Sequence, residues 1–281
     1  MSDITLGQYF PGDSFIHKLD PRTKMLWLIL MIVLIFVANN VLGVMFMLLV
    51  TLITVFMTKV PLRLYFKGLK AIWIILIISA ALNIFYVKGT EETLLFSWWK
   101  INIYSEGIRQ CVLIAVRLLS LILCSSVLSF TTSPTQLTGA IEWLFSPLKV
   151  FGVKVHELAM MMTIALRFVP TLLEETEKIM SAQKARGADL DSGGLLKRVK
   201  ALIPILIPLF VSSYRRAYDL AVAMECRCYT GDGNRTKLNV PRFTGRDAAV
   251  LVIGILLTAA VVLFNLNVLG LDITWLRIKI I

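Results

Sequence analysis

The sequence predicts an all-α polytopic membrane protein with about five transmembrane helices and long amphipathic helices on the cytoplasmic side. Of its 281 residues, 57% are hydrophobic, whereas soluble domains are usually about 45–50% apolar. Apolar runs that are long enough, or nearly long enough, to cross a bilayer alternate with short polar or basic loops. Two further long segments, 155–184 and 195–228, instead carry apolar residues as a stripe along one face.

The net charge of +11 fits a membrane topology better than a nucleic-acid partner. Charged residues make up 17% of the chain, so a sizeable polar part must lie outside the bilayer. Lys and Arg collect in the cytoplasmic loops of membrane proteins, which accounts for a positive sum. No basic cluster is interleaved with aromatic residues in the manner of a nucleic-acid motif, so we expect no nucleic-acid partner.

The first 24 residues form a polar lead-in to the first apolar run. The Pro-Gly-Asp-Ser stretch at 11–14 and the Asp20-Pro21 pair are turn signals. Arg22 and Lys24 then flank the apolar residues that follow. We expect a cytoplasmic N-terminus, with part of the lead-in on the membrane surface.

Two apolar runs, 25–38 and 41–57, are expected to form a helical hairpin. Each run is short against the roughly 20 residues that a helix needs to span a bilayer. Lys24 and Lys59 at their far ends can extend their stems toward the headgroups, which makes two spans feasible. The link between the runs permits only a tight turn, and it holds no basic residue, so we place it on the outer side.

The loop after the hairpin gives the clearest topology signal. It holds four basic residues and no acid: Lys59, Arg63, Lys67 and Lys70. This loop is therefore expected in the cytoplasm. The third and fourth spans are expected at 71–87 and 108–130. The loop between them, 88–109, mixes acids with bases and holds aromatic residues of the kind that gather at an outer interface.

Arg117 lies inside the fourth expected span. A charge at that depth is costly and is a functional candidate by default. We favour a structural interpretation, in which the guanidinium faces the helix bundle or pairs with a polar neighbour. A role in substrate binding is the weaker alternative, because no acidic partner falls in any expected span.

Beyond the fourth span the membrane pattern ends. A Thr/Ser turn at 131–135 precedes a helix start near Pro134. Residues 137–148 form a short amphipathic segment that we expect on the membrane surface. From 155 to 184, apolar residues recur every three or four positions and charged residues occupy the other face, unlike an ordinary span. Pro170 is expected to kink this segment or to start a new one.

A polar turn at 188–194 separates the first striped segment from the second, 195–228. The second segment contains the apolar run 201–211, which is short and interrupted by Pro204 and Pro208, so it is not expected to be an ordinary span. Two consecutive antiparallel stripes should pack on each other or cross, leaving both far ends exposed.

The expected organisation has three parts. Residues 1–130 hold the lead-in and four spans, and residues 131–245 hold the cytoplasmic helices. Residues 246–281 hold the last span, at 247–265, and a tail that we place on the outer side. With four spans before them, the cytoplasmic helices share the side of the N-terminus.

The sequence offers almost no motif that could support catalysis. The sequence holds no Gly-Lys pair, which excludes a P-loop, and His156-Glu157 lacks the second histidine of a zinc protease because Met160 stands there. Asp189 and Asp191 are better explained by a solvated turn than by catalysis. Four cysteines and two distant histidines give no set of four zinc ligands, so we expect no metal and no cofactor. We therefore expect that the chain is not an enzyme.

Two short Arg-centred words remain, one at the end of each striped segment. Residues 182–187 and 223–228 both have the form Ala-x-x-small-Arg-small, and their arginines are 41 positions apart. Arginine offers a rigid, permanently charged fork for carboxylates or carbonyls, and small neighbours let a partner approach closely. Either word alone would pass for a helix end with a basic cap. Their repetition favours docking into two similar pockets, through Ala185, Arg186, Gly187, Cys226, Arg227 and Cys228.

The chain resembles the transmembrane (T) component of energy-coupling factor (ECF) vitamin transporters. That family carries two short x-Arg-x words, here Ala-Arg-Gly at 185–187 and Cys-Arg-Cys at 226–228. The turn at 11–14, His17 and the LDPRTK stretch at 19–24 also resemble the opening of the family, so the likeness covers most of the chain. The second word departs from the common Ala-Arg-Gly form by having cysteine on both sides.

The resemblance implies a non-enzymatic, multi-pass scaffold of the cell membrane that works within an ABC transporter complex. Two ATP-binding cassette ATPases would dock on the Arg words. A small substrate-binding membrane protein, the S component, would be held beside them in the lipid. Movement of the ATPases would pass through the striped segments, the coupling helices of the family, to the S component, which would tip and release its vitamin inward.

Two alternatives remain open from the sequence. One is the T component of a dedicated cobalt or nickel importer of the same family, which the sequence barely separates from a vitamin transporter. The other is an integral membrane enzyme acting on lipid headgroups. Such an enzyme would need clustered acids or a nucleophile at a membrane face, and no expected span shows one.

Overall fold

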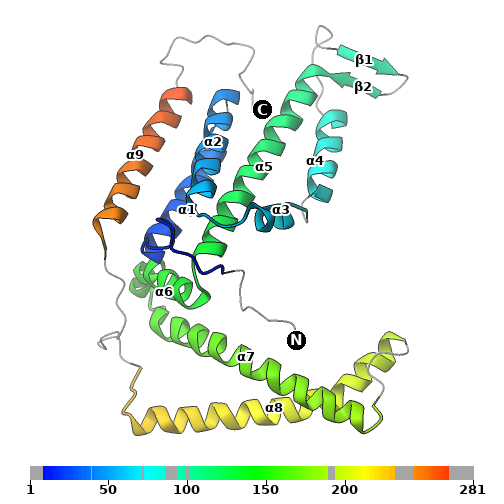
Figure 1. Ribbon diagram of the computed structural model, residues 1–281, viewed down its shortest axis with the longest axis vertical. Helices are drawn as coiled ribbons and strands as arrows, with labels where there is room; N and C mark the ends of the chain where they lie inside the picture. Colours follow the sequence, from blue (N-terminus) through cyan, green and yellow to red (C-terminus); the bar gives the residue numbers. More distant parts are fainter. Residues whose placement is uncertain are drawn as a thin grey trace. The chain divides into compact units, whose positions relative to one another are not determined.

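The computed structural model describes residues 9–38, 40–70, 73–86, 94–98, 101–188, 194–231 and 243–265 (Figure 1). They form two compact units. The first comprises the described parts of Gly7–Ala140 and Pro241–Ile281, and the second comprises the described part of Ile141–Val240. In both units most of the described residues are helical, which confirms the prediction of an all-α polytopic protein.

Helices α1 (Pro21–Val37) and α2 (Val41–Met57) form the expected hairpin. α1 begins at the predicted turn. There the Asp20 carboxylate accepts a 2.8 Å hydrogen bond from the Arg22 N–H, and proline holds the first helical position. Three residues separate the two helices, so α2 must turn back along α1. One of the three, Asn39, is outside the described residues.

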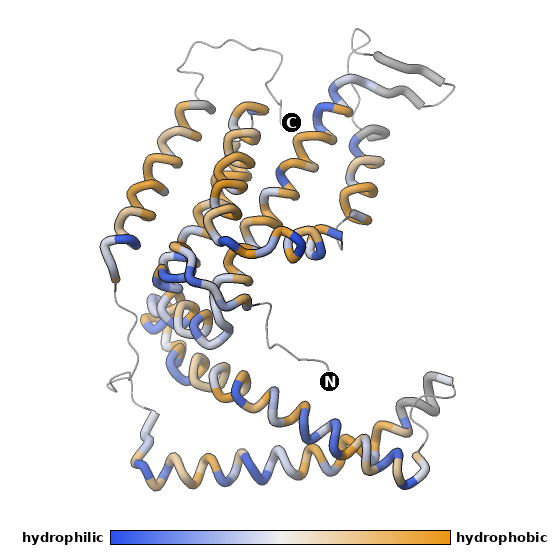
Figure 2. Tube along the Cα trace, in the orientation of Figure 1, coloured by the Kyte–Doolittle hydropathy of each residue, from blue (hydrophilic) through white to orange (hydrophobic). Residues whose placement is uncertain are grey.

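The core of the first unit lies where α1 and α2 meet α5 (Ser105–Thr131) and α9 (Gly245–Asn265). Its buried members are Met31, Leu34, Ile35, Ala38, Val44, Met47, Leu113, Cys124 and Val261. α9 approaches α1 closely at Gly254, where a Cβ would lie 2.7 Å from Leu30 Cδ2. The outward surfaces of these helices are apolar too (Figure 2), as expected of helices surrounded by lipid.

The basic loop predicted for the cytoplasm contains a helix, α3 (Leu62–Lys70). Tyr65 attaches it to the rest of the unit: its hydroxyl lies 3.0 Å from Thr58 Oγ1, and its ring packs edge-on against Phe130 with 5.0 Å between centroids. α4 (Trp73–Tyr86) follows at the third expected span, bent by 55° relative to α3. Its 14 residues give a length of only about 21 Å.

The loop expected at 88–109 contains a short strand pair that we did not predict from the sequence. β1 (Leu94–Trp98) pairs antiparallel with β2 (Ile101–Tyr104), with Trp98 opposite Ile101. β-Branched and aromatic residues, which favour strands, are frequent in this stretch. The aromatic residues alone had pointed to an interfacial belt.

Among the described residues, three helices are long and apolar enough to cross a membrane: α5, α7 (Val155–Ala185) and α9 over Gly245–Leu263. α3 and α4 make a fourth if they form one bent span, and α2 is apolar but shorter. A helix therefore stands at each of the five expected spans, although only α5 and α9 reach full length alone. α7 passes this test because most of its charges lie in its C-terminal half, whereas we expected an amphipathic helix outside the bilayer.

α6 (Pro134–Leu144) begins at the predicted proline, and the 3₁₀ turn η2 (Ser146–Phe151) then leads into α7. The second unit consists mainly of α7 and α8 (Leu195–Cys226). Both are continuous helices, with Pro170 inside α7 and prolines 204 and 208 inside α8. No new segment starts at Pro170. Each proline removes one backbone hydrogen bond, and the flanking turns carry the helix on.

Candidate functional site

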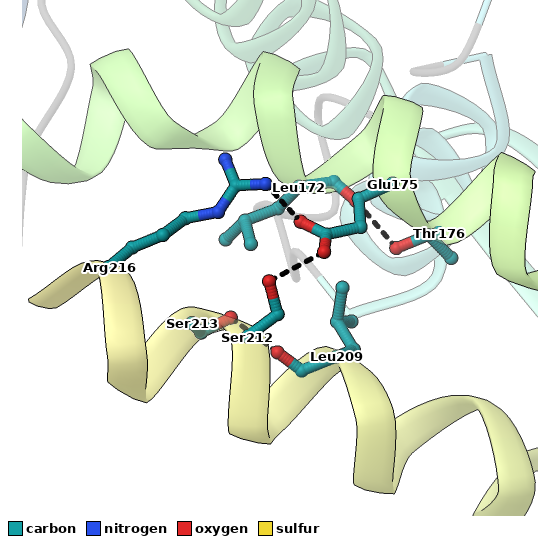
Figure 3. A network of polar contacts seen from close by, with 7 residues as sticks. All are labelled: Leu172, Glu175, Thr176, Leu209, Ser212, Ser213 and Arg216. Carbon is teal, nitrogen blue, oxygen red and sulfur yellow. Dashed lines mark hydrogen bonds and ion pairs between the residues drawn. The ribbon is translucent and has the colours of Figure 1, made fainter.

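α7 and α8 contact each other through a polar cluster centred on Glu175 (Figure 3). The Glu175 carboxylate accepts two hydrogen bonds from α8, one from the Ser212 hydroxyl at 2.5 Å and one from Arg216 Nη2 at 2.7 Å. The Glu175 side chain is 21% exposed and that of Arg216 is 39% exposed, so the pair is partly shielded from water. The cluster fixes the point along each helix at which the two meet. We expected the two striped segments to pack on each other or cross, and the contact between them is this polar cluster.

This contact lies at equivalent positions of the two helices. Glu175 precedes Arg186 by eleven residues, and Arg216 precedes Arg227 by eleven residues. At 1.5 Å per residue, each arginine backbone is about 16 Å along its helix from the contact. The C-terminal ends of α7 and α8 lie on opposite sides of the contact (Figure 1). The two Arg words are therefore held at two separate tips, joined by about 33 Å of helix.

The first Arg word forms the C-terminal cap of α7. Arg186 is the cap residue, and Gly187 after it has a left-handed backbone with φ of +85°. The Gly187 N–H donates to the Lys184 carbonyl at 3.0 Å, and the Ala188 N–H donates to the Gln183 carbonyl at 3.0 Å. This pair of bonds is a Schellman motif, which satisfies carbonyls that a helix end would leave without partners.

The second Arg word forms the same cap on α8. Arg227 is the cap residue, and Cys228 takes the left-handed position with φ of +54°. The Cys228 N–H donates to the Glu225 carbonyl at 2.8 Å, and the Tyr229 N–H donates to the Met224 carbonyl at 3.0 Å. A left-handed residue with a Cβ costs about 1–2 kcal/mol, so cysteine holds here a geometry that glycine would adopt at lower cost.

The six residues predicted for docking are all exposed: Ala185, Arg186, Gly187, Cys226, Arg227 and Cys228. Each arginine stands at the negative end of its helix dipole, where a cation is favourable. Small side chains flank each arginine, so a partner surface can approach the guanidinium closely. The duplicated sequence word thus corresponds to a duplicated local structure.

Helices α7 and α8, called the arms from here on, also expose many large apolar side chains. On α8 the exposed residues are Leu202, Ile203, Leu206, Ile207, Phe210, Val211, Tyr214, Tyr218 and Val222, and on α7 they are Leu158, Met161, Met162 and Val169. Phe210 alone is 72% exposed. A contiguous apolar surface of this kind marks contact with lipid or with another protein.

The start of α7 is held by two polar contacts. His156 Nδ1 lies 3.0 Å from Glu142 Oε1, which ties α7 to the end of α6. The Lys154 ammonium lies 3.0 Å from Glu157 Oε1, and this hydrogen bond raises the pKa of Lys154. Among the residues that the structure describes, no group of three or more His, Cys, Asp or Glu side chains could hold a metal ion.

The sequence interpretation missed the Glu175 cluster. It did not single out Glu175, Ser212 or Arg216. One signal was available: Glu175 and Arg216 are 41 residues apart, the same spacing as the two cap arginines. Asp189 and Asp191, interpreted as a turn, lie outside the described residues.

Arg117 has structural partners within the first unit. Its Nη2 donates a 2.8 Å hydrogen bond to the carbonyl of Ala38, at the C-terminal end of α1. Its guanidinium carbon also lies 5.9 Å from the centroid of the Phe36 ring. These contacts support the structural interpretation of Arg117 over a role in substrate binding.

Comparison with known proteins identifies similar chains along almost the whole length. A family described as CbiQ, cobalt transport protein, matches residues 12–238. The energy-coupling factor transporter transmembrane protein EcfT of Clostridium kluyveri is 51% identical over 247 residues, which are 88% of this chain and 91% of that protein. The protein of the same name from Bacillus subtilis is 44% identical over 259 residues, 92% of this chain and 97% of that protein. The one from Lactococcus lactis is 42% identical over 265 residues, 94% and 99% of the two lengths.

Proposed function

The chain belongs to the CbiQ family and is the T component of an ECF transporter, and from that premise we propose that it couples ATP hydrolysis by two partner ATPases to movement of an S component. The observation that carries the proposal is the pair of similar Arg-containing caps at the two tips of the α7–α8 pair. Two similar ATPase subunits need two similar docking elements, and the chain offers two.

Each cap suits a pocket that presents carboxylate or carbonyl oxygens. A guanidinium at the tip of a helix can enter such a pocket, while the small flanking residues allow the helix end itself to follow. The Glu175–Arg216 contact holds the two helices together. A shift of one ATPase relative to the other would then reach the whole α7–α8 pair instead of moving one helix alone.

The docking role is tested by Arg186→Ala and Arg227→Ala, singly and together, in the complex purified through a tag on this chain. We expect each single variant to retain less ATPase, and the double variant to lose ATPase copurification and substrate uptake. Arg63→Ala, an exposed arginine of α3, is the matched control. If the double variant still copurifies with ATPases and transports normally, the Arg words are not docking elements.

We assign the exposed apolar surface of α8 to contact with the S component. An apolar surface lets a partner slide or tip without breaking specific polar bonds, which suits a partner that must reorient in the bilayer. Phe210→Glu should reduce S-component copurification while ATPase copurification stays intact. If Phe210→Glu reduces copurification of neither subunit, the S component binds another surface of the chain.

The substrate class that we propose is a vitamin, as the resemblance in sequence implies. The second candidate is a cobalt or nickel importer, which the description of the matching family favours. Mass spectrometry of the subunits that copurify, followed by uptake of the ligand that each S component binds, separates the two. Several different S components on this one chain would favour vitamins, and one metal-binding S component would favour the importer.

The chain itself is proposed to be non-catalytic and oriented with the N-terminus and arms in the cytoplasm. In a chain whose four native cysteines are replaced by serine, Lys67→Cys in the basic helix α3 should react with a membrane-impermeant maleimide only in inside-out vesicles. Labelling in right-side-out vesicles would reverse the orientation. ATP or lipid turnover by the purified chain without partner subunits would instead favour a membrane enzyme.

A further inference from the structure

The described part of the lead-in before α1, residues 9–20, is built around His17. Its Nε2 lies 2.9 Å from the Phe10 carbonyl oxygen, so that nitrogen carries a proton, and its Nδ1 lies 2.6 Å from Ser14 Oγ. Gly12 leaves room for the ring, since a Cβ there would lie 3.1 Å from His17 Cε1. The Phe10 N–H then donates to the Phe130 carbonyl at 2.9 Å, which attaches the lead-in to the end of α5.

Lys24 caps the C-terminal end of α5. Its ammonium donates to the carbonyl of Thr131, the last residue of α5, at 2.8 Å, and to the carbonyl of His17 at 3.2 Å. The last carbonyls of a helix have no partner within it and carry its negative dipole end, so a cation is favourable here. Lys24 is only 5% exposed. Lysine is rarely buried unless its charge is paired, so we expect the bond to the Thr131 carbonyl to contribute to holding the end of α5.

Asp247 caps the N-terminal end of α9. Its Oδ2 accepts from the Thr244 N–H at 2.9 Å, which caps α9. Its Oδ1 accepts from the Asp20 N–H at 2.9 Å, which ties the same cap to the start of α1. The Asp247 side chain is completely buried. One short stretch, 20–24, therefore holds both the last turn of α5 and the first turn of α9.

These two helix ends flank the segment that contains α7 and α8. The unit formed by Ile141–Val240 begins within α6, which follows α5, and it ends before α9. Thr131 stands ten residues before that unit and Thr244 four residues after it. A displacement of the arms that travels along the chain must pass both helix ends, and a frayed end would absorb it.

We propose that Asp20, Lys24 and Asp247 form an anchor that fastens the two chain attachments of the arms to α1, so that arm movement is passed on instead of being lost at frayed helix ends. These are positioning residues. Their role in coupling rests on the proposed function, whereas the hydrogen bonds that hold the two helix ends to α1 do not depend on that function. One experiment therefore tests those hydrogen bonds, and a second experiment tests coupling.

The fastening is tested by hydrogen exchange on the purified complex in nanodiscs. Asp247→Asn keeps the shape but places an NH₂ group against one of the two N–H donors, so one hydrogen bond must break. We expect the amide that loses its acceptor, that of Asp20 or of Thr244, to exchange about tenfold faster. Asp13→Asn, an exposed carboxylate of the same lead-in, is the control and should change neither amide. Unchanged exchange in Asp247→Asn would overturn the anchor, whatever becomes of the docking role.

Coupling is tested in proteoliposomes by the substrate transported per ATP hydrolysed. Asp247→Asn and Lys24→Gln should retain the ATPases and hydrolyse ATP, while transport per ATP falls by at least about threefold. Lys24→Arg, which keeps the cation, should restore most of it. Transport per ATP that stays normal although the helix ends exchange faster would overturn the coupling role. So would loss of ATPase copurification in step with transport, because that pattern indicates general instability. If Asp247→Asn does not accumulate, Lys24→Gln alone carries the same comparison.

Discussion

The 2.7 Å ion pair between Glu175 and Arg216 joins α7 and α8 three helical turns before the arginine that ends each helix. Each of the two residues lies eleven positions before the arginine of its own Arg word. The contact is therefore equally far from the C-terminal tips of α7 and α8. The Ser212 hydroxyl adds a second bond to the same carboxylate. Removing the carboxylate should therefore loosen the pair at the point from which both tips are held.

Glu175→Gln, Arg216→Met and the double variant form a cycle that isolates this contact. Because both side chains are partly exposed, we expect a coupling of about 0.5–1 kcal/mol in the free energy of unfolding of the detergent-solubilised chain. Exchanging the charges, as Glu175→Arg with Arg216→Glu, should recover part of the loss in substrate uptake. If the losses in unfolding free energy of the two single variants simply add in the double variant, the pair does not hold the helices together. The same conclusion follows if the charge-exchanged chain takes up no more substrate than either single variant.

Cys228→Gly should stabilise the chain or leave its stability unchanged. The left-handed backbone at Cys228 costs a residue with a Cβ about 1–2 kcal/mol, and the greater freedom of glycine in the unfolded chain offsets part of this gain. The mirror change, Gly187→Ala, should destabilise by about 1 kcal/mol through backbone strain, since no atom of the described residues lies within 4 Å of the added Cβ. The midpoint of thermal unfolding measures both. ATPase copurification should survive Cys228→Gly, and its loss would assign the thiol a direct contact.

Hydropathy and local patterns predicted the helices but not the contacts between them. The apolar runs located α1, α2, α4, α5 and α9 because lipid imposes one simple rule on a span. A helix end with a basic cap was the alternative interpretation of each Arg word, and glycine at 187 is typical of such an end, whereas Cys228 carries no local sign that its backbone is left-handed. Lys24 looked like an ordinary flanking base. Its bond to the Thr131 carbonyl, 107 residues away, could come only from the fold.

Gly254 should tolerate one added carbon but not three. In Gly254→Ala the Cβ would meet Leu30 Cδ2 at 2.7 Å, and that atom is the far end of a flexible side chain that can rotate away. We expect a loss below about 1 kcal/mol. Gly254→Val should cost about 1–3 kcal/mol, because the branched side chain must push α9 from α1. Thermal unfolding in detergent separates the two, and equal midpoints would mean that α9 does not pack closely on α1.

Arg117→Met should destabilise the chain by about 1–2 kcal/mol, because the Ala38 carbonyl would lose the bond that closes the C-terminal end of α1. Arg117→Lys keeps a cation and one donor but not the planar fork over Phe36, so its loss should be smaller. The measurements are the unfolding midpoint and the KM for uptake by the assembled transporter. A structural arginine lowers the midpoint and leaves KM nearly unchanged. A raised KM at an unchanged midpoint would instead place Arg117 in the path of the substrate, contrary to the contacts of its guanidinium.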